Sequence, residues 1–182
     1  MLILGLSLWG FGEASAHQGQ IRRTLMLEPA GLVLEVLVEV VVTGRERQAA
    51  LFALADQDRS GGLQASELER IGHELALFGL DQLEVQSGTT TLSLDGVETK
   101  VQAQPGQPIV ALIHGRLPLL KGRVLILETG KSAAPLTVRL LPGAPALRPS
   151  RGRPGKKGLI EVELGARDHL ELRPEVPQKA AE

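Results

Sequence analysis

The chain has 182 residues, with 20 Lys plus Arg and 21 Asp plus Glu, so its formal net charge at pH 7 is -1. This length suits one domain of ordinary size and excludes a large multidomain enzyme, while 43% hydrophobic and 23% charged residues are typical of a globular protein. The balanced charge argues against a dedicated nucleic-acid-binding protein, and the absence of Cys excludes disulfides, thiolate metal sites and thiol catalysis.

The N-terminal segment has the pattern of an export signal. An apolar run from Leu2 to Phe11 precedes Ala14-Ser15-Ala16, which has small residues at the two positions that signal peptidase reads. The run is shorter than the roughly 20 apolar residues of a membrane-spanning helix. We therefore expect residues 1–16 to be a signal peptide, and a periplasmic or secreted bacterial protein without a stable membrane span after cleavage. No Lys or Arg precedes the run, so a buried or disordered N-terminal segment is the alternative.

Residues 21–43 are rich in β-branched side chains and alternate between apolar and polar. Glu35 and Glu39 interrupt a run of Leu and Val at even spacing, which is the period of a strand with one buried face. The pattern predicts two strands around Pro29-Ala30-Gly31.

The period then changes to that of helices. Thr43-Gly44-Arg45-Glu46 matches a capping box and predicts a helix over residues 45–55. A second helix is expected over residues 65–78, ending at Gly79 because glycine readily takes the left-handed conformation that terminates helices. Residues 45–79 are thus predicted to be a helical hairpin.

Strand patterns return after residue 80 and continue to the end of the domain. The predicted strands cover residues 83–86, 90–94, 97–101, 109–114, 123–128, 136–141, 159–164 and 169–172. Asp95-Gly96 is expected to form a two-residue hairpin turn. The predicted fold class is mainly β, an antiparallel, immunoglobulin-like β-sandwich built from residues 17–44 and 80–173, with the helical hairpin as an insertion and residues 174–182 as a disordered tail.

The segment between Pro142 and Gly158 is basic and rich in Pro and Gly. It contains five cationic side chains and no acidic one: Arg148, Arg151, Arg153, Lys156 and Lys157. This composition predicts a mobile, solvated loop, with contact to an anionic partner as the alternative.

Residues Asp56–Glu67, between the two predicted helices, place oxygen-bearing groups at alternate positions. Calcium takes 6 to 8 oxygen ligands, so a chain that curls around it must supply oxygens in this manner. The loop resembles the twelve-residue calcium loop of the EF-hand family, D-x-[DN]-x-[DN]-G-x₅-E. The resemblance implies a Ca²⁺ site with ligands from Asp56, Asp58, Ser60, Gly62, Gln64 (through water) and Glu67 (through both carboxylate oxygens).

The loop departs from the family pattern in two respects. Ser60 stands where the pattern has Asp or Asn, so only three carboxylates contribute and we expect a weak site. EF-hands usually occur in pairs, but the sequence has no second such loop; Leu63 is therefore expected to find a strand partner in the β domain or in a second copy of the chain, a homodimer. The alternative is an Asp- and Gly-rich turn that merely joins two helices.

Two further features suggest other metals and partners. Cleavage after Ala16 would make His17 the N-terminus, where amine and imidazole together chelate metal, so a periplasmic copper or nickel carrier or transporter-accessory protein is the alternative function. Leu92-Ser93-Leu94-Asp95-Gly96 is loosely similar to a hairpin in the soluble periplasmic regions associated with bacterial nickel or hydrogenase-type permeases, which implies a membrane transporter or another envelope protein as partner. His73 and His114 are expected to be ordinary surface or half-buried residues.

Catalytic motifs are missing from the sequence. Neither Gly-x-Ser-x-Gly nor H-E-x-x-H occurs, and no phosphate-binding glycine loop is present. Asp56 and Asp58 are better explained as metal ligands than as an acid and a base. We expect a non-enzymatic, calcium-binding structural or interaction module.

Overall fold

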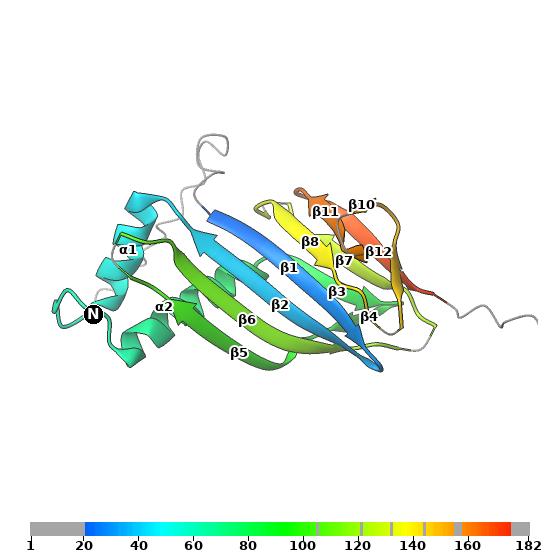
Figure 1. The fold of residues 1–182 in the computed structure, drawn as a ribbon, viewed down its shortest axis with the longest axis horizontal. Helices are drawn as coiled ribbons and strands as arrows, with labels where there is room; N and C mark the ends of the chain where they lie inside the picture. Colours follow the sequence, from blue (N-terminus) through cyan, green and yellow to red (C-terminus); the bar gives the residue numbers. More distant parts are fainter. Residues whose placement is uncertain are drawn as a thin grey trace, which may run out of the picture.

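The computed structural model describes residues 21–104, 106–120, 122–131, 133–143, 145–154 and 158–175. Its strands form two sheets, and two helices lie together at one end of the molecule (Figure 1). The predicted mainly β fold is therefore confirmed. The predicted signal peptide, His17 and residues 176–182 of the predicted tail lie outside the described residues.

The larger sheet has seven strands in the order β10-β11-β8-β1-β2-β6-β5. These strands are β1 (Ile21–Ala30), β2 (Val33–Val42), β5 (Asp95–Gln102), β6 (Ile109–Pro118), β8 (Leu136–Leu140), β10 (Arg153–Pro154) and β11 (Ile160–Leu164). Neighbours run antiparallel except β1 and β8, which are parallel, so the prediction of a purely antiparallel sandwich is wrong in this detail. The strand that precedes β8 belongs to the other sheet, so no hairpin sets the direction of β8 relative to β1.

The smaller sheet has five strands in the order β4-β3-β7-β12-β9. These strands are β3 (Leu83–Ser87), β4 (Thr90–Leu92), β7 (Leu125–Thr129), β9 (Leu147–Pro149) and β12 (His169–Pro174). Side chains from the inner faces of both sheets form one apolar core. The two sheets therefore pack face to face and share their buried surface.

Alternation along β1 and β2 explains why these residues form strands. Leu34, Val36 and Val38 are almost fully buried, whereas Glu35, between the first two, is half-buried on the opposite face. Ala30 pairs with Val33, so the two predicted strands around the turn are confirmed. Burying one complete row of aliphatic side chains per strand is the main favourable term for this arrangement.

The predicted Asp95-Gly96 hairpin is wrong. Asp95 and Gly96 begin β5, in the larger sheet, whereas β4 lies in the smaller one, so the chain crosses between the sheets after Leu92. Gly96 does have a positive φ of 60°, but it lies in a β-bulge between Asp95 and Glu98. The hairpin in this region is instead β3–β4, where Ser87 pairs with Thr90.

Both predicted helices are present, as α1 (Arg45–Ala55) and α2 (Ala65–Leu80), but their ends differ from the prediction. The N-cap of α1 is Gly44, so the predicted capping box at Thr43 does not begin this helix. Gly79 is not a C-cap, because α2 continues through it. A Cβ at Gly79 would lie 2.9 Å from both Val40 Cγ2 and Ile113 Cδ1, so glycine is required for close packing of α2 on the sheet.

Arg23 is a charged side chain in the core, only 2% exposed. Its guanidinium donates to the carbonyl oxygens of Phe78 and Asp81, at 3.3 and 3.1 Å, and also to that of Ala134. Burial lowers the pKa of Arg23, and the nearby Asp81 charge opposes this effect. The last carbonyls of a helix have no intrahelical partner, so Arg23 satisfies the end of α2 from within β1.

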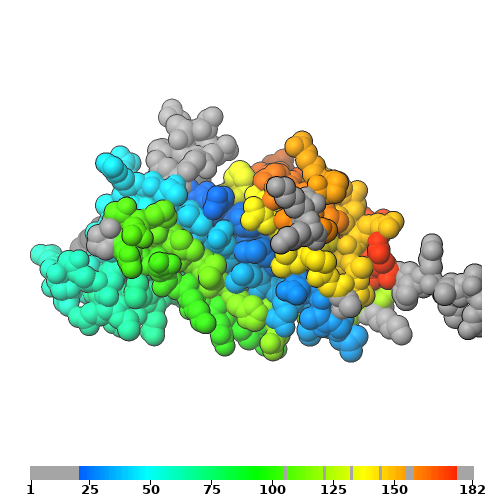
Figure 2. All heavy atoms as spheres, viewed as in Figure 1, coloured from blue at the N-terminus to red at the C-terminus, as the bar shows by residue number. Residues whose placement is uncertain are grey.

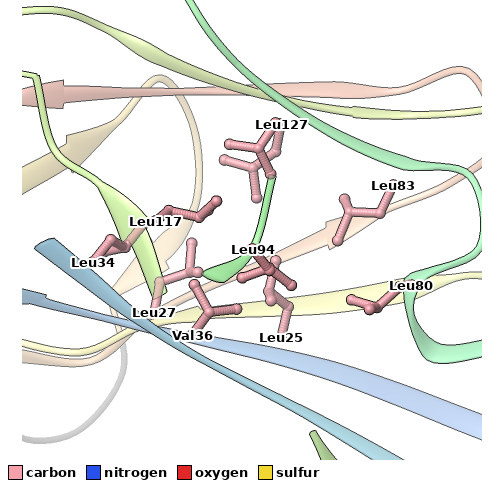
Figure 3. A pocket seen from close by; sticks show the side chains of 10 residues that line it. Leu25, Leu27, Leu34, Val36, Leu80, Leu83, Leu94, Leu117 and Leu127 are labelled. Carbon is pink, nitrogen blue, oxygen red and sulfur yellow. The ribbon is translucent and has the colours of Figure 1, made fainter. Parts of the chain in front are cut away.

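A small cavity of about 20 Å³ lies between the two sheets (Figure 3). Leu25, Leu27 and Leu34 line it from the larger sheet, Leu127 from the smaller one, and Leu94 from the crossing between them. The lining is aliphatic and offers a water molecule no hydrogen-bond partner, so the space is a packing defect of the core, not a ligand site.

The basic segment between residues 142 and 158 is more ordered than predicted, because it contains β9 and β10. Arg148 pairs with Glu175 at 2.7 Å and Arg151 with Asp168 at 2.5 Å. Residues 155–157 lie outside the described residues. The sequence predicts a disordered tail from Pro174 onward, but Pro174 is the last residue of β12.

Candidate metal centre

The loop that resembles the EF-hand joins α1 to α2 at the end of the molecule where the helices lie (Figure 1). α2 is amphipathic and buries Ile71 and Leu75 in the core, while α1 buries Ala55 directly before the loop. Phe52 of α1 also packs against this core from a half-buried position. Both ends of the loop are therefore fixed to the β domain by apolar contacts.

Three of the six predicted ligands converge on one point. Asp56, Asp58 and Glu67 each offer a carboxylate oxygen, and these oxygens lie within 4.8 Å of one another. Their exposure is graded: Asp58 is exposed, Asp56 is half-buried, and Glu67 is only 6% exposed. Three like charges this close repel one another, so the arrangement needs opposing positive charge or hydrogen-bond donors.

Glu67 closes the loop from the first turn of α2. Its Oε1 accepts the backbone N–H of Gln57 and its Oε2 that of Gln64, both at 2.9 Å. One side chain thus ties the start of the loop to its end. Each carboxylate oxygen has more than one lone pair, so these hydrogen bonds leave capacity for a cation.

Asp56 and Asp58 share one backbone donor inside the loop. The N–H of Ser60 donates to Oδ1 of both, at 2.9 Å each, and the N–H of Gly61 donates to Asp56 Oδ2 at 3.1 Å. The backbone N–H of Ser60 and then its hydroxyl lower the pKa of Asp58 below its usual range. Asp58 is therefore ionised at neutral pH, as a metal ligand must be.

The other predicted ligands, Ser60, Gly62 and Gln64, belong to the same hydrogen-bond network. The hydroxyl of Ser60 donates to the carbonyl of Gly62 at 3.0 Å. Gln64 Nε2 donates to Asp58 Oδ2 at 2.8 Å. All six positions are thus connected, and the three carboxylates form the cluster of charged oxygens.

Two residues of the loop have left-handed backbone conformations. Gly61 has a φ of 77°, as expected for the sharp turn at the sixth position. Arg59 has a φ of 56°, which is uncommon for a residue with a side chain. Sequence reasoning missed Arg59, because nothing in its side chain favours this conformation.

Leu63 does not have the predicted strand partner among the described residues. It lies in none of the strands, and its half-buried side chain packs against the core. The alternative, pairing with a second copy of the chain at this position, stays a prediction.

A second polar group lies on the outer face of the larger sheet. Glu35 accepts a hydrogen bond from Arg116 Nε at 2.9 Å and lies 2.8 Å from His114 Nε2. These side chains, with Met26, Leu37 and others, line a shallow depression of about 320 Å³. His114 is half-buried, as predicted, and sequence reasoning missed this cluster because its members come from strands far apart in the chain.

No family model matches this chain, and no curated protein matches it. The resemblance to the EF-hand family therefore rests on the loop itself. Neither helix in the described part of the chain has the length and apolar character needed to cross a bilayer.

Proposed function

We propose that this chain is an exported, non-enzymatic module that binds one calcium ion in an EF-hand-type site between α1 and α2. The observation that carries the proposal is the convergence of Asp56, Asp58 and Glu67 within 4.8 Å in the loop that joins two anchored helices. The carboxylates come from positions 1, 3 and 12 of the loop, which are acidic positions of the EF-hand pattern.

The donor set favours a hard divalent cation. All six predicted ligands offer oxygen, and the loop from Asp56 to Glu67 contains no sulfur or imidazole ligand. A 2+ ion would replace the mutual repulsion of the three carboxylates by attraction. Calcium fits better than magnesium, since a cage of many protein oxygens with a bidentate Glu suits the larger ion.

A weak site and a structural role follow from the same residues. Only three carboxylates contribute, and sites of extracellular modules have dissociation constants of about 10⁻⁴ to 10⁻³ M. At about 1 mM calcium and a dissociation constant of about 1 mM, binding stabilises the folded state by only about 0.4 kcal/mol. The ion would order the loop and fix the angle between α1 and α2, and fast signalling is not expected.

The N-terminal sequence supports export to a compartment outside the cytoplasm. The apolar run and Ala14-Ser15-Ala16 have the signal-peptide pattern, and such compartments supply the calcium that a weak site needs. Within this proposal the two sheets form an immunoglobulin-like sandwich that presents the loop to an envelope partner such as a transporter. Their face-to-face packing supports this, and the parallel β1–β8 ladder is a departure from that pattern.

Calorimetric titration of the full chain with CaCl₂ tests the proposal. We expect saturable binding in the range of about 10⁻⁴ to 10⁻³ M, and at least about a tenfold loss of affinity in Glu67→Gln and in Asp58→Asn. Asp58 is exposed, so its variant keeps the fold even if Glu67→Gln weakens the helix start.

Glu74→Gln is the matched control, because Glu74 is exposed on the same helix and undergoes the same chemical change. It should bind calcium as the wild type does. Equal affinity in the wild type and both ligand variants, or no binding to the folded wild type, would contradict the proposal.

A further inference from the structure

β5 is the last strand of the larger sheet and has one free edge. It pairs with β6 on one side, and no other described strand pairs with it on the other side. Figure 1 shows β5 at the outer edge of the sheet, and Figure 2 shows this green segment at the surface of the molecule. Of its eight residues, seven are exposed and one is half-buried. A long strand with unpaired backbone groups is a template for pairing with another chain.

α2 packs against one face of β5. Thr99 and Val101 face the helix, where a Cβ at Gly72 would lie 3.3 and 3.0 Å from their Cγ2 atoms. Because side chains alternate along a strand, Glu98 and Lys100 lie on the opposite, outer face. The edge therefore keeps its extended shape without a second strand beside it.

The sequence of β5 is self-complementary about Thr99. Glu98 and Lys100 flank it with opposite charges, and Val97 and Val101 flank these in turn. When two such strands run antiparallel with Thr99 opposite Thr99, Glu98 of each copy lies opposite Lys100 of the other. Opposite charges in directly paired positions are favourable in a sheet, and like charges are unfavourable.

We propose that two copies of this chain associate through their β5 strands, antiparallel and centred on Thr99. The dimer has a two-fold axis, so the same ion pair forms twice and the larger sheet continues across both copies. The regular part of β5 begins at Glu98, after the bulge, so the paired segment is centred on Glu98, Thr99 and Lys100. Charged residues on an edge strand commonly prevent pairing, but here their order makes them complementary to a second copy.

Sedimentation equilibrium of the full chain tests this dimer. The runs contain EDTA, so the outcome is independent of calcium binding. The wild type should form a dimer of twice 19.4 kDa. Glu98→Lys and Lys100→Glu each place like charges opposite one another twice, and each should raise the dissociation constant by at least about tenfold.

Two combinations distinguish the proposed register from a general effect of charge. The double variant Glu98→Lys/Lys100→Glu should dimerise as the wild type does. An equal mixture of the two single variants should form a heterodimer, since one chain then presents two lysines and the other two glutamates at the paired positions. Lys131→Glu, the same charge change on an exposed residue outside β5, should leave the dimer unchanged.

A monomeric wild type at concentrations of about 0.5 mM would overturn the proposal, since the dissociation constant would then be in the millimolar range or weaker. Single variants that dimerise like the wild type would also overturn it. A double variant that is folded, as checked by circular dichroism, but stays monomeric would also overturn the proposal.

Discussion

The burial of Arg23 and its hydrogen-bond partners could not be predicted from local sequence patterns. Alternation in β1 places Arg23 on the same face as Leu25 and Leu27, and the structure buries all three. Arginine is almost never fully buried unless it is paired, so alternation alone does not predict a buried Arg23. Those partners are backbone carbonyls at the end of α2, more than 50 residues away, so the role of Arg23 became visible only in the fold.

Gly79 was predicted to end the second helix, but α2 continues through it and packs closely on the sheet there. This close packing leads to a testable prediction. Gly→Ala inside a helix normally stabilises it by about 1 kcal/mol. At Gly79 the new Cβ would meet the buried Val40 and Ile113 at 2.9 Å, and such overpacking costs about 1–3 kcal/mol. Urea unfolding should therefore show that Gly79→Ala lowers the free energy of unfolding.

Gly72→Ala is the control for this substitution. Its Cβ would lie 3.0 Å from Val101 Cγ2, but Val101 is half-buried on an edge strand and has room to shift. The stability change should be smaller than at Gly79. A Gly79→Ala variant more stable than the wild type would mean that the packing against α2 is not tight.

At the scale of elements, short periodic runs were predictable and their connections were not. β1, β2 and α2 follow from hydrophobic spacing, because each buries a face that its own residues define. α1 buries only Ala55, and it was predicted from a capping box that does not begin the helix. Asp95-Gly96 has the composition of a hairpin turn, but the chain uses Gly96 in a bulge while crossing between sheets. Leu94 is half-buried against the core at this crossing, and that long-range packing overrides the local turn preference.

The basic segment was predicted to be mobile because its acidic partners lie outside it in the sequence. Asp168 pairs with Arg151 at 2.5 Å. Partial burial raises the pKa of Asp168, but the Arg151 ion pair and the backbone N–H groups of His169 and Gly165 outweigh this, so the net pKa lies below the usual range. The segment containing β9 and β10 is thus anchored near β12.

This ion pair predicts a pH dependence. The pKa of Asp168 is lower in the folded chain than in the unfolded chain, where it is about 3.9. The pair therefore stabilises the fold above about pH 4 and ceases to do so as the pH falls through the folded-state value. Asp168→Asn should have a lower melting temperature than the wild type at pH 7, and the gap should narrow as the pH falls below about 4.

Arg151→Gln removes the other partner and should show the same convergence with the wild type at low pH. A gap that is as wide at about pH 3 as at pH 7, for either variant, would show that the ion pair does not stabilise the fold.

At the scale of the whole molecule, the convergence of Asp56, Asp58 and Glu67 was easier to predict than the architecture around it. These carboxylates and the backbone N–H groups that donate to them lie within one run of twelve residues, so spacing alone was informative. The strand order of the larger sheet depends on pairings such as β1 with β8, which bring together residues far apart in the chain. No local pattern specifies such a pairing.

The placement of the loop gives a physical account of what calcium would do. α2 carries Glu67 at its start, buries Ile71 and Leu75 in the core, and contacts β5 through Gly72. An ion bound by Glu67 would therefore act on a helix that is already fixed to the larger sheet. The expected effect is local ordering of the loop, with little change in the β domain.

X-ray diffraction from crystals grown in about 10 mM CaCl₂ would show whether the loop holds an ion, since that concentration is well above the expected dissociation constant. We expect a density peak among Asp56, Asp58 and Glu67, with oxygen ligands at about 2.3–2.6 Å and both carboxylate oxygens of Glu67 on the ion. A well-ordered loop that holds no ion at this concentration, with Glu67 bonded only to the N–H groups of Gln57 and Gln64, would contradict the proposed calcium site.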